Sequence, residues 1–198
     1  MILETLQILK EQLEDYFEQV GLSKNIIIDN IALWESGAQE ADRLDGKVVL
    51  SLINVEEEMT LKNTPSVKVV NSKTEYFNPP VNLNLFLLVS ANCSTYDISL
   101  NSISRAIEFF QGKKIFTSSN TVYNRSNPSI HPPDYFKFIV DLYTPGFETL
   151  NNIWGMLGGR QLPSVLYKIQ IVEISRDKKL AGGELITHID GTLNQIEP

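Results

Sequence analysis

The strongest structural signal in the sequence is the segment Val81-Asn82-Leu83-Asn84-Leu85-Phe86-Leu87-Leu88-Val89-Ser90-Ala91. In an extended strand, successive side chains point to opposite faces, so leucine and valine fill one face here while the other carries Phe86 and Leu88. Residues 47–55 are also apolar on both faces, with Val48, Leu50 and Leu52 on one and Val49, Ile53 and Val55 on the other. Because strands of this kind are buried on both sides, we expect both segments inside a covered sheet.

Three segments have the three- and four-residue apolar spacing of amphipathic helices. Residues 2–20 form the first, which ends at Gly21, a residue suited to the left-handed helix terminus. The second follows the Ser94–Asp97 capping signal and ends at Gly112. The third begins at Thr144-Pro145 and ends at Gly158-Gly159. The predicted buried stripes are Tyr96, Leu100, Ile103, Ile107 and Phe110 in the second helix and Phe147, Leu150, Ile153, Trp154 and Leu157 in the third.

Shorter strand signals lie around these helices, at residues 26–28, 67–70, 114–117, 136–143 and 165–174. The alternation of helices and strands predicts an α/β (α+β) fold: a single domain with one mixed, largely antiparallel sheet flanked by about three helices. We place this domain at residues 1–178. Residues 179–198 follow a charged break and carry an apolar cluster, so we interpret them as a C-terminal arm that either contacts another molecule or folds back on its own domain.

The composition excludes several classes of function. With 17 Lys+Arg against 24 Asp+Glu, the 198-residue chain has a formal charge of −7, which disfavours nucleic-acid binding and attachment to anionic membranes. The longest clearly apolar run, residues 85–89, is far shorter than the roughly 18 to 20 residues that cross a bilayer. The N-terminus lacks the basic and apolar regions of a signal peptide, so we expect assembly in the cytoplasm. A single cysteine, Cys93, excludes an intramolecular disulfide.

No catalytic, cofactor or metal site is predicted. The two histidines, His131 and His188, lie in a proline-rich loop and in the C-terminal segment, neither beside a nucleophile motif. The glycine-rich residues 155–160 follow a helix, whereas phosphate loops open one. The run Glu56-Glu57-Glu58 is typical of a solvated strand end. We therefore interpret the chain as an assembly component and not as an enzyme.

Several segments together resemble the N-terminal domain family of cap, or tail-terminator, proteins from extracellular contractile injection systems, the phage-tail-like particles of bacteria. The resemblance covers most of the chain. It runs through residues 47–58 and 81–85, the helix end Glu108-Phe109-Phe110-Gln111, and finally Leu150-Asn151-Asn152-Ile153-Trp154 and Leu162-Pro163-Ser164-Val165-Leu166-Tyr167-Lys168.

This resemblance implies a structural protein that forms a homo-hexameric ring. The ring would cap the inner tube, contact the last sheath ring and end polymerisation, without cofactor, nucleic acid or membrane insertion. The particle would assemble in the bacterial cytoplasm and then become extracellular or remain anchored. The candidate assembly contacts, which we place in the C-terminal segment and in the loop at residues 118–134, are Leu180, Leu185, Ile186, Ile189, Tyr123 and Arg125.

Two alternatives stay open at this point. One is a sheath-initiating or baseplate adaptor protein of the same particle, which location alone would distinguish. The other is a small α/β enzyme or ligand-binding domain. A deep apolar pocket around Phe136, Phe138 and Trp154 would favour that domain, whereas in a terminator these aromatic residues should form packed core.

Overall fold

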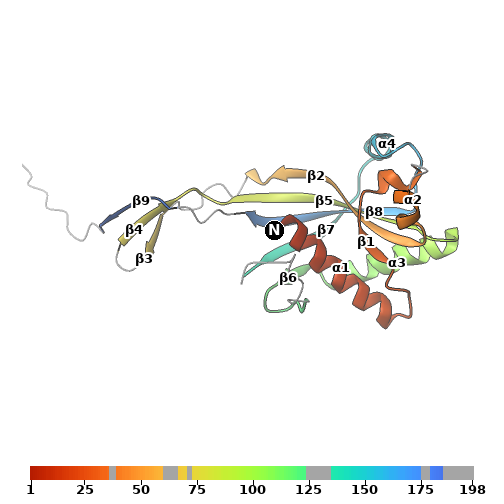
Figure 1. Ribbon diagram of the computed structural model, residues 1–198, viewed down its shortest axis with the longest axis horizontal. Helices are drawn as coiled ribbons and strands as arrows, with labels where there is room; N and C mark the ends of the chain where they lie inside the picture. The colour runs from red at the N-terminus through yellow and green to blue at the C-terminus, as the bar shows by residue number, and fades with distance from the viewer. Residues whose placement is uncertain (36–38, 60–66, 71–72, 124–134, 175–178, 185–198) are drawn as a thin grey trace, which may run out of the picture.

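A six-stranded sheet with helices on both faces forms the body of the protein, and a three-stranded sheet extends from one end of it (Figure 1). The computed structural model describes residues 1–35, 39–59, 67–70, 73–123, 135–174 and 179–184. In spatial order, the strands of the body are β1 (Ile26–Ile28), β2 (Lys47–Glu57), β5 (Val81–Asn92), β8 (Ser164–Ile174), β7 (Lys137–Tyr143) and β6 (Ile115–Thr117).

All neighbouring strands of the body sheet are antiparallel except β1 and β2, which are parallel. The two segments expected inside the sheet, β2 and β5, are interior strands, and β5 lies between β2 and β8. Their register places Val48 opposite Ala91 and Leu50 opposite Val89. The predicted fold class, an α/β domain with a mixed and largely antiparallel sheet, is confirmed.

One face of the body sheet is covered by α1 (Ile2–Gln19) and α3 (Tyr96–Gly112). Helix α1 ends where expected, because Gly21 has a φ of 76° and the amide of Leu22 donates to the carbonyl of Phe17. Phenylalanines and aliphatic residues fill the space between the helices and the sheet. The largest fully buried side chains of this core include Phe17, Phe110, Phe116, Phe138, Leu9 and Leu13.

Helix α3 has the expected bounds but buries a different face from the predicted stripe. Ile103 and Phe110 are buried, whereas Tyr96 and Leu100 are 70% and 45% exposed and Ile107 is exposed as well. The helix turns small side chains toward the sheet, which allows its backbone to approach closely. The hydroxyl of Ser99 donates to the carbonyl of Thr95 and that of Ser102 to the carbonyl of Ile98, so neither buried hydroxyl is without a hydrogen-bond partner. These small residues are Ser99, Ser102 and Ala106.

The opposite face is covered by the short 3₁₀ helix η1 (Ile31–Glu35), α2 (Gln39–Leu44) and α4 (Phe147–Met156). Helix α2 was not predicted. The prediction that α4 begins at Pro145 was wrong. Gly146 is the N-cap, and its carbonyl accepts the amide of Leu150. Phe147 is therefore the first helical residue and is 92% exposed, not part of the buried stripe. Ile153 and Trp154 are buried, and Gly158 and Gly159, both with positive φ, follow the helix.

The three-stranded sheet lies away from the helices, at the end of the molecule toward which β5 extends (Figure 1). It consists of β3 (Val67–Val70), β4 (Lys73–Phe77) and β9 (Lys179–Glu184), all antiparallel. We call these three strands the arm. The start of the expected C-terminal arm, residue 179, coincides with β9, but β9 pairs with β4 of the same chain. The arm thus includes two strands from the middle of the sequence that we did not expect outside the body.

Candidate functional site

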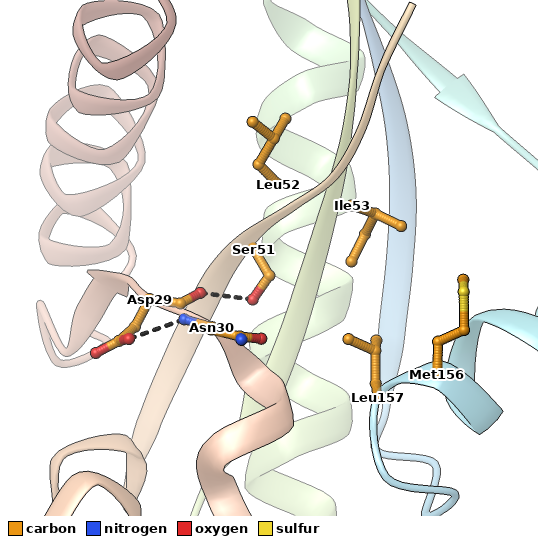
Figure 2. A pocket seen from close by; sticks show the side chains of 7 residues that line it. All are labelled: Asp29, Asn30, Ser51, Leu52, Ile53, Met156 and Leu157. Carbon is orange, nitrogen blue, oxygen red and sulfur yellow. Dashed lines mark hydrogen bonds between the residues drawn. The ribbon is translucent and has the colours of Figure 1, made fainter.

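A polar hollow lies where β1 leads into η1, beside β2 and the end of α4 (Figure 2). Its volume is about 440 Å³, and Asp29, Asn30 and Ser51 line its polar side. The hydroxyl of Ser51 donates to the carbonyl of Asp29 over 2.7 Å and accepts the amide of Ile31 over 3.0 Å. Ser51 is 4% exposed, so these two bonds satisfy a hydroxyl that burial would otherwise leave without partners.

The carboxylate of Asp29 also has structural partners. One oxygen accepts the amide of Asn30 over 2.8 Å, and the other lies 3.4 Å from the guanidinium of Arg43 in α2. Nucleophilic catalysis needs a hydroxyl with a base beside it. In the hollow, the serine hydroxyl donates its hydrogen bond to a backbone carbonyl, and the carboxylate is paired with Arg43. These groups therefore connect β1, η1, α2 and β2 and form no catalytic pair.

An apolar groove adjoins this hollow, and the two share Ile53 and Met156. Its volume is about 450 Å³. One flank of α4 forms a wall, and side chains of β2, β5, β7 and β8 form the floor, where the rings of Phe86 and Tyr143 meet edge to face at 5.3 Å. Met156 on the wall is 74% exposed. The remaining lining residues are Asn54, Glu56, Thr149, Ile153 and Leu166.

The aromatic residues that would mark a ligand pocket are packed core. Phe136, Phe138 and Trp154 are each at most 3% exposed. Phe136 and Phe138 stack at 5.8 Å in the core beneath α1 and α3, whereas Trp154 belongs to the core on the other face of the sheet. The expectation of packed aromatics is confirmed, and these residues share no pocket.

Two charged groups of the α3 region have described polar partners. Lys113 connects α3 to α1, because its ammonium donates to Gln12 Oε1 over 2.7 Å and to the carbonyl of Asn120 over 3.2 Å, and it lies 5.0 Å from the centre of the Phe116 ring. Burial lowers the pKa of this amine. On the outer side of α3, the hydrogen bond from Arg105 holds the pKa of Glu108 below its ordinary value.

Within the described ranges, no three His, Cys, Asp or Glu side chains come together in a way that could hold a metal ion. None of the helices in that part of the chain is both long and apolar enough to span a bilayer. Cys93 is a free, half-buried thiol whose sulfur lies 3.8 Å from the hydroxyl of Ser102.

The predicted assembly residues fall into three groups. Tyr123 is half-buried, with its ring 5.9 Å from that of Phe136, and it packs against the core. Leu180 lies in β9 of the arm. The other four, Arg125, Leu185, Ile186 and Ile189, lie outside the described residues, as do His131 and His188. Whether any of the six makes an assembly contact stays a prediction.

Sequence reasoning missed the groove and most of the arm. The groove depends on the angle at which α4 crosses the sheet, which no local pattern specifies. One signal for the arm was available: the alternating residues 73–77 lie between Asn71-Ser72 and Asn78-Pro79-Pro80, which is typical of a short hairpin strand.

Two solved structures of injection-particle components are similar in fold to this chain. One is a PVC sheath/tube terminator, in the extended state, of an extracellular contractile injection system; it aligns with a TM-score of 0.63 at 14% identity, over 100% of this chain and 64% of that one. The other is the tube-terminating cap of the anti-feeding prophage (AFP), with a TM-score of 0.50 at 16% identity, over 74% of this chain and 49% of that one. This chain therefore spans less than two thirds of either protein.

The family model of the Pvc16 N-terminal domain matches residues 4–188. The chain therefore belongs to the Pvc16 N-terminal domain family, and the resemblance inferred from the sequence is confirmed. A comparison with curated proteins finds no match.

Proposed function

We propose that the chain is a structural protein of a contractile injection system, which caps the inner tube and the last sheath ring and ends assembly as a ring of six copies. The observation that carries this proposal is the likeness to the PVC sheath/tube terminator, which extends over 100% of this chain. The second likeness, to a tube-terminating cap, points to the same end of the particle.

The local chemistry supports a structural role. The polar hollow uses its serine and its carboxylate to join four elements, and the aromatic residues are packed in two cores. In this proposal, the chain acts through shape and surface and turns over no substrate. Its partners are further copies of itself, the inner-tube protein and the sheath protein. It assembles in the cytoplasm of the producing bacterium and leaves as part of the particle.

Location tests this proposal. We expect a tagged chain, incorporated into particles and labelled with gold, to appear by negative-stain electron microscopy at the end opposite the baseplate. Tagged inner-tube protein serves as the control: gold along the whole length of the tube shows that the label can reach tagged protein in the particle. Label at the baseplate end would contradict the proposal and favour the sheath-initiating or adaptor alternative. Particles that never carry the label would contradict both.

A further inference from the structure

The arm carries apolar side chains but forms no core of its own. Val67 and Tyr76 face each other in the β3–β4 register, which puts them on the same side of the sheet, and they are 39% and 44% exposed. None of the arm residues with described side chains is buried. A small sheet gains stability in water by covering a hydrophobic face. Among the residues whose side chains are described, the apolar side of the arm is therefore exposed at Val67 and Tyr76.

The arm also stands clear of its own body (Figure 1). The connection from β4 leads directly into β5, a 12-residue strand paired along most of its length with β2 on one side and β8 on the other. At about 3.3 Å per residue, such a strand is roughly 40 Å long, and its pairing on both edges keeps it from folding back. Within the described residues, no part of the body lies over the arm, so we look to a second copy for the surface that covers it.

The apolar groove beside α4 offers such a surface. Its wall exposes Met156, and its floor exposes the paired rings of Phe86 and Tyr143. The carboxylate of Glu56 lies in its lining, and Asp29 lines the adjoining hollow. The groove is therefore apolar with one carboxylate, that of Glu56, in its lining, whereas the carboxylate of Asp29 in the adjoining hollow is paired with Arg43.

The charge of the two parts is complementary. The arm, residues 67–77 and 179–184, contains three lysines and two glutamates, a net charge of +1 within a chain of net charge −7. The rest of the chain therefore carries −8. Opposite charge favours an approach of the arm to the body of a second copy, and it disfavours contact between two bodies.

We propose that the arm of one copy packs into the groove beside α4 of the next copy, with the Val67–Tyr76 side against Met156, Phe86 and Tyr143. The inference rests on the proposed function, because it supplies the contact that joins neighbours in the ring. Arm and groove are different surfaces of one chain, so the contact is head-to-tail. Repetition of such a contact closes into a ring when the rotation between copies allows it.

Two substitutions of exposed residues test the arm side and the groove side of this contact one at a time. Tyr76→Glu puts a carboxylate on the apolar side of the arm, and Met156→Lys puts an ammonium into the groove, where it repels the lysines of the arm. The matched controls, Tyr96→Glu and Leu100→Lys, introduce the same charges on exposed apolar positions of α3. Circular dichroism and thermal unfolding check that all four variants fold.

The readout is the oligomeric state of the full chain, measured by native mass spectrometry and analytical ultracentrifugation over a range of concentrations. We expect the wild type and the α3 variants to assemble alike. Each contact variant alone should need at least about tenfold higher concentration to do so, as is usual when an interface residue of high energetic weight is lost.

Mixing the two contact variants gives the decisive result. The intact arm of the Met156→Lys chain fits the intact groove of the Tyr76→Glu chain, so an equimolar mixture should form heterodimers and stop there. A mixture that stays monomeric, a wild type that is monomeric at every concentration, or contact variants that assemble like the wild type would overturn the inference. In the last case the proposed function would still stand, since gold labelling tests it independently. Contact variants that form rings but lose binding to tube or sheath would assign the arm to that partner instead.

Discussion

Ser51 joins two segments through a single buried hydroxyl, because it bonds both to the carbonyl of Asp29 and to the amide of Ile31. Replacing it with alanine would leave a buried donor and a buried acceptor without partners. We expect Ser51→Ala to lower the free energy of unfolding by about 1 to 3 kcal/mol, measured by urea denaturation. The control is Ser104→Ala, at an exposed serine of α3, with an expected change below about 0.5 kcal/mol. Equal stability of the two variants would contradict this role for Ser51.

Lys113 connects the end of α3 to α1 through Gln12 and contacts the ring of Phe116. A half-buried ammonium with these partners contributes hydrogen bonds and a cation–π contact, although burial itself disfavours its charge. We expect Lys113→Ala to destabilise the fold by about 1 kcal/mol. The same change at the neighbouring Lys114, whose side chain is exposed, should leave the unfolding midpoint nearly unchanged. A larger effect at Lys114 than at Lys113 would refute the assignment.

Helix α3 could be predicted from the sequence only in part. Its bounds were predicted from the Ser94–Asp97 signal and the glycine at 112, although the N-cap is Thr95, but its buried face did not follow from hydrophobicity. The helix places Ser99, Ser102 and Ala106 against the sheet, so packing closeness outweighed the burial of Tyr96 and Leu100. An apolar stripe in the sequence cannot predict which face of this helix is buried, because the buried face depends on how closely the helix packs against the sheet.

The same helix gives a stability prediction. Phe110 is 1% exposed, and its ring lies 4.5 Å from that of Tyr167, so Phe110→Ala should cost about 3 to 5 kcal/mol through the cavity it leaves. Leu100→Ala, on the exposed flank, should cost less than about 1 kcal/mol. Chemical denaturation of both variants checks the difference. Similar losses at the two positions would contradict the exposed position of Leu100.

The sheet itself could be predicted in part. Strands β2 and β5 are apolar on both faces, and that pattern correctly indicated interior positions. The arm was missed because β4 pairs with β9, a segment about a hundred residues further along the chain, and because its residues bury no core. The groove was missed because four strands and a helix must meet before it exists.

In the proposed ring, the negative charge of each copy opposes assembly. Six copies at −7 each amount to −42, and the net charge of +1 on each arm is small beside this total. At low ionic strength the Debye length is long, about 30 Å at 0.01 M salt against about 10 Å at 0.1 M, so repulsion between copies extends further. We expect ring assembly to weaken as salt falls over this range, as measured by sedimentation velocity. Assembly that is independent of salt, or stronger at low salt, would contradict this expectation.

In the proposed function, the molecule is a cap that matches the end of a tube and offers the next layer nothing to bind. The most direct measurement is the length distribution of tubes and sheaths by electron microscopy, in bacteria that produce the particle with and without this chain. We predict a narrow distribution with the chain, and irregular or overlong tubes without it that return to normal when the chain is supplied again. Tubes of the same uniform length in its absence would contradict the central claim.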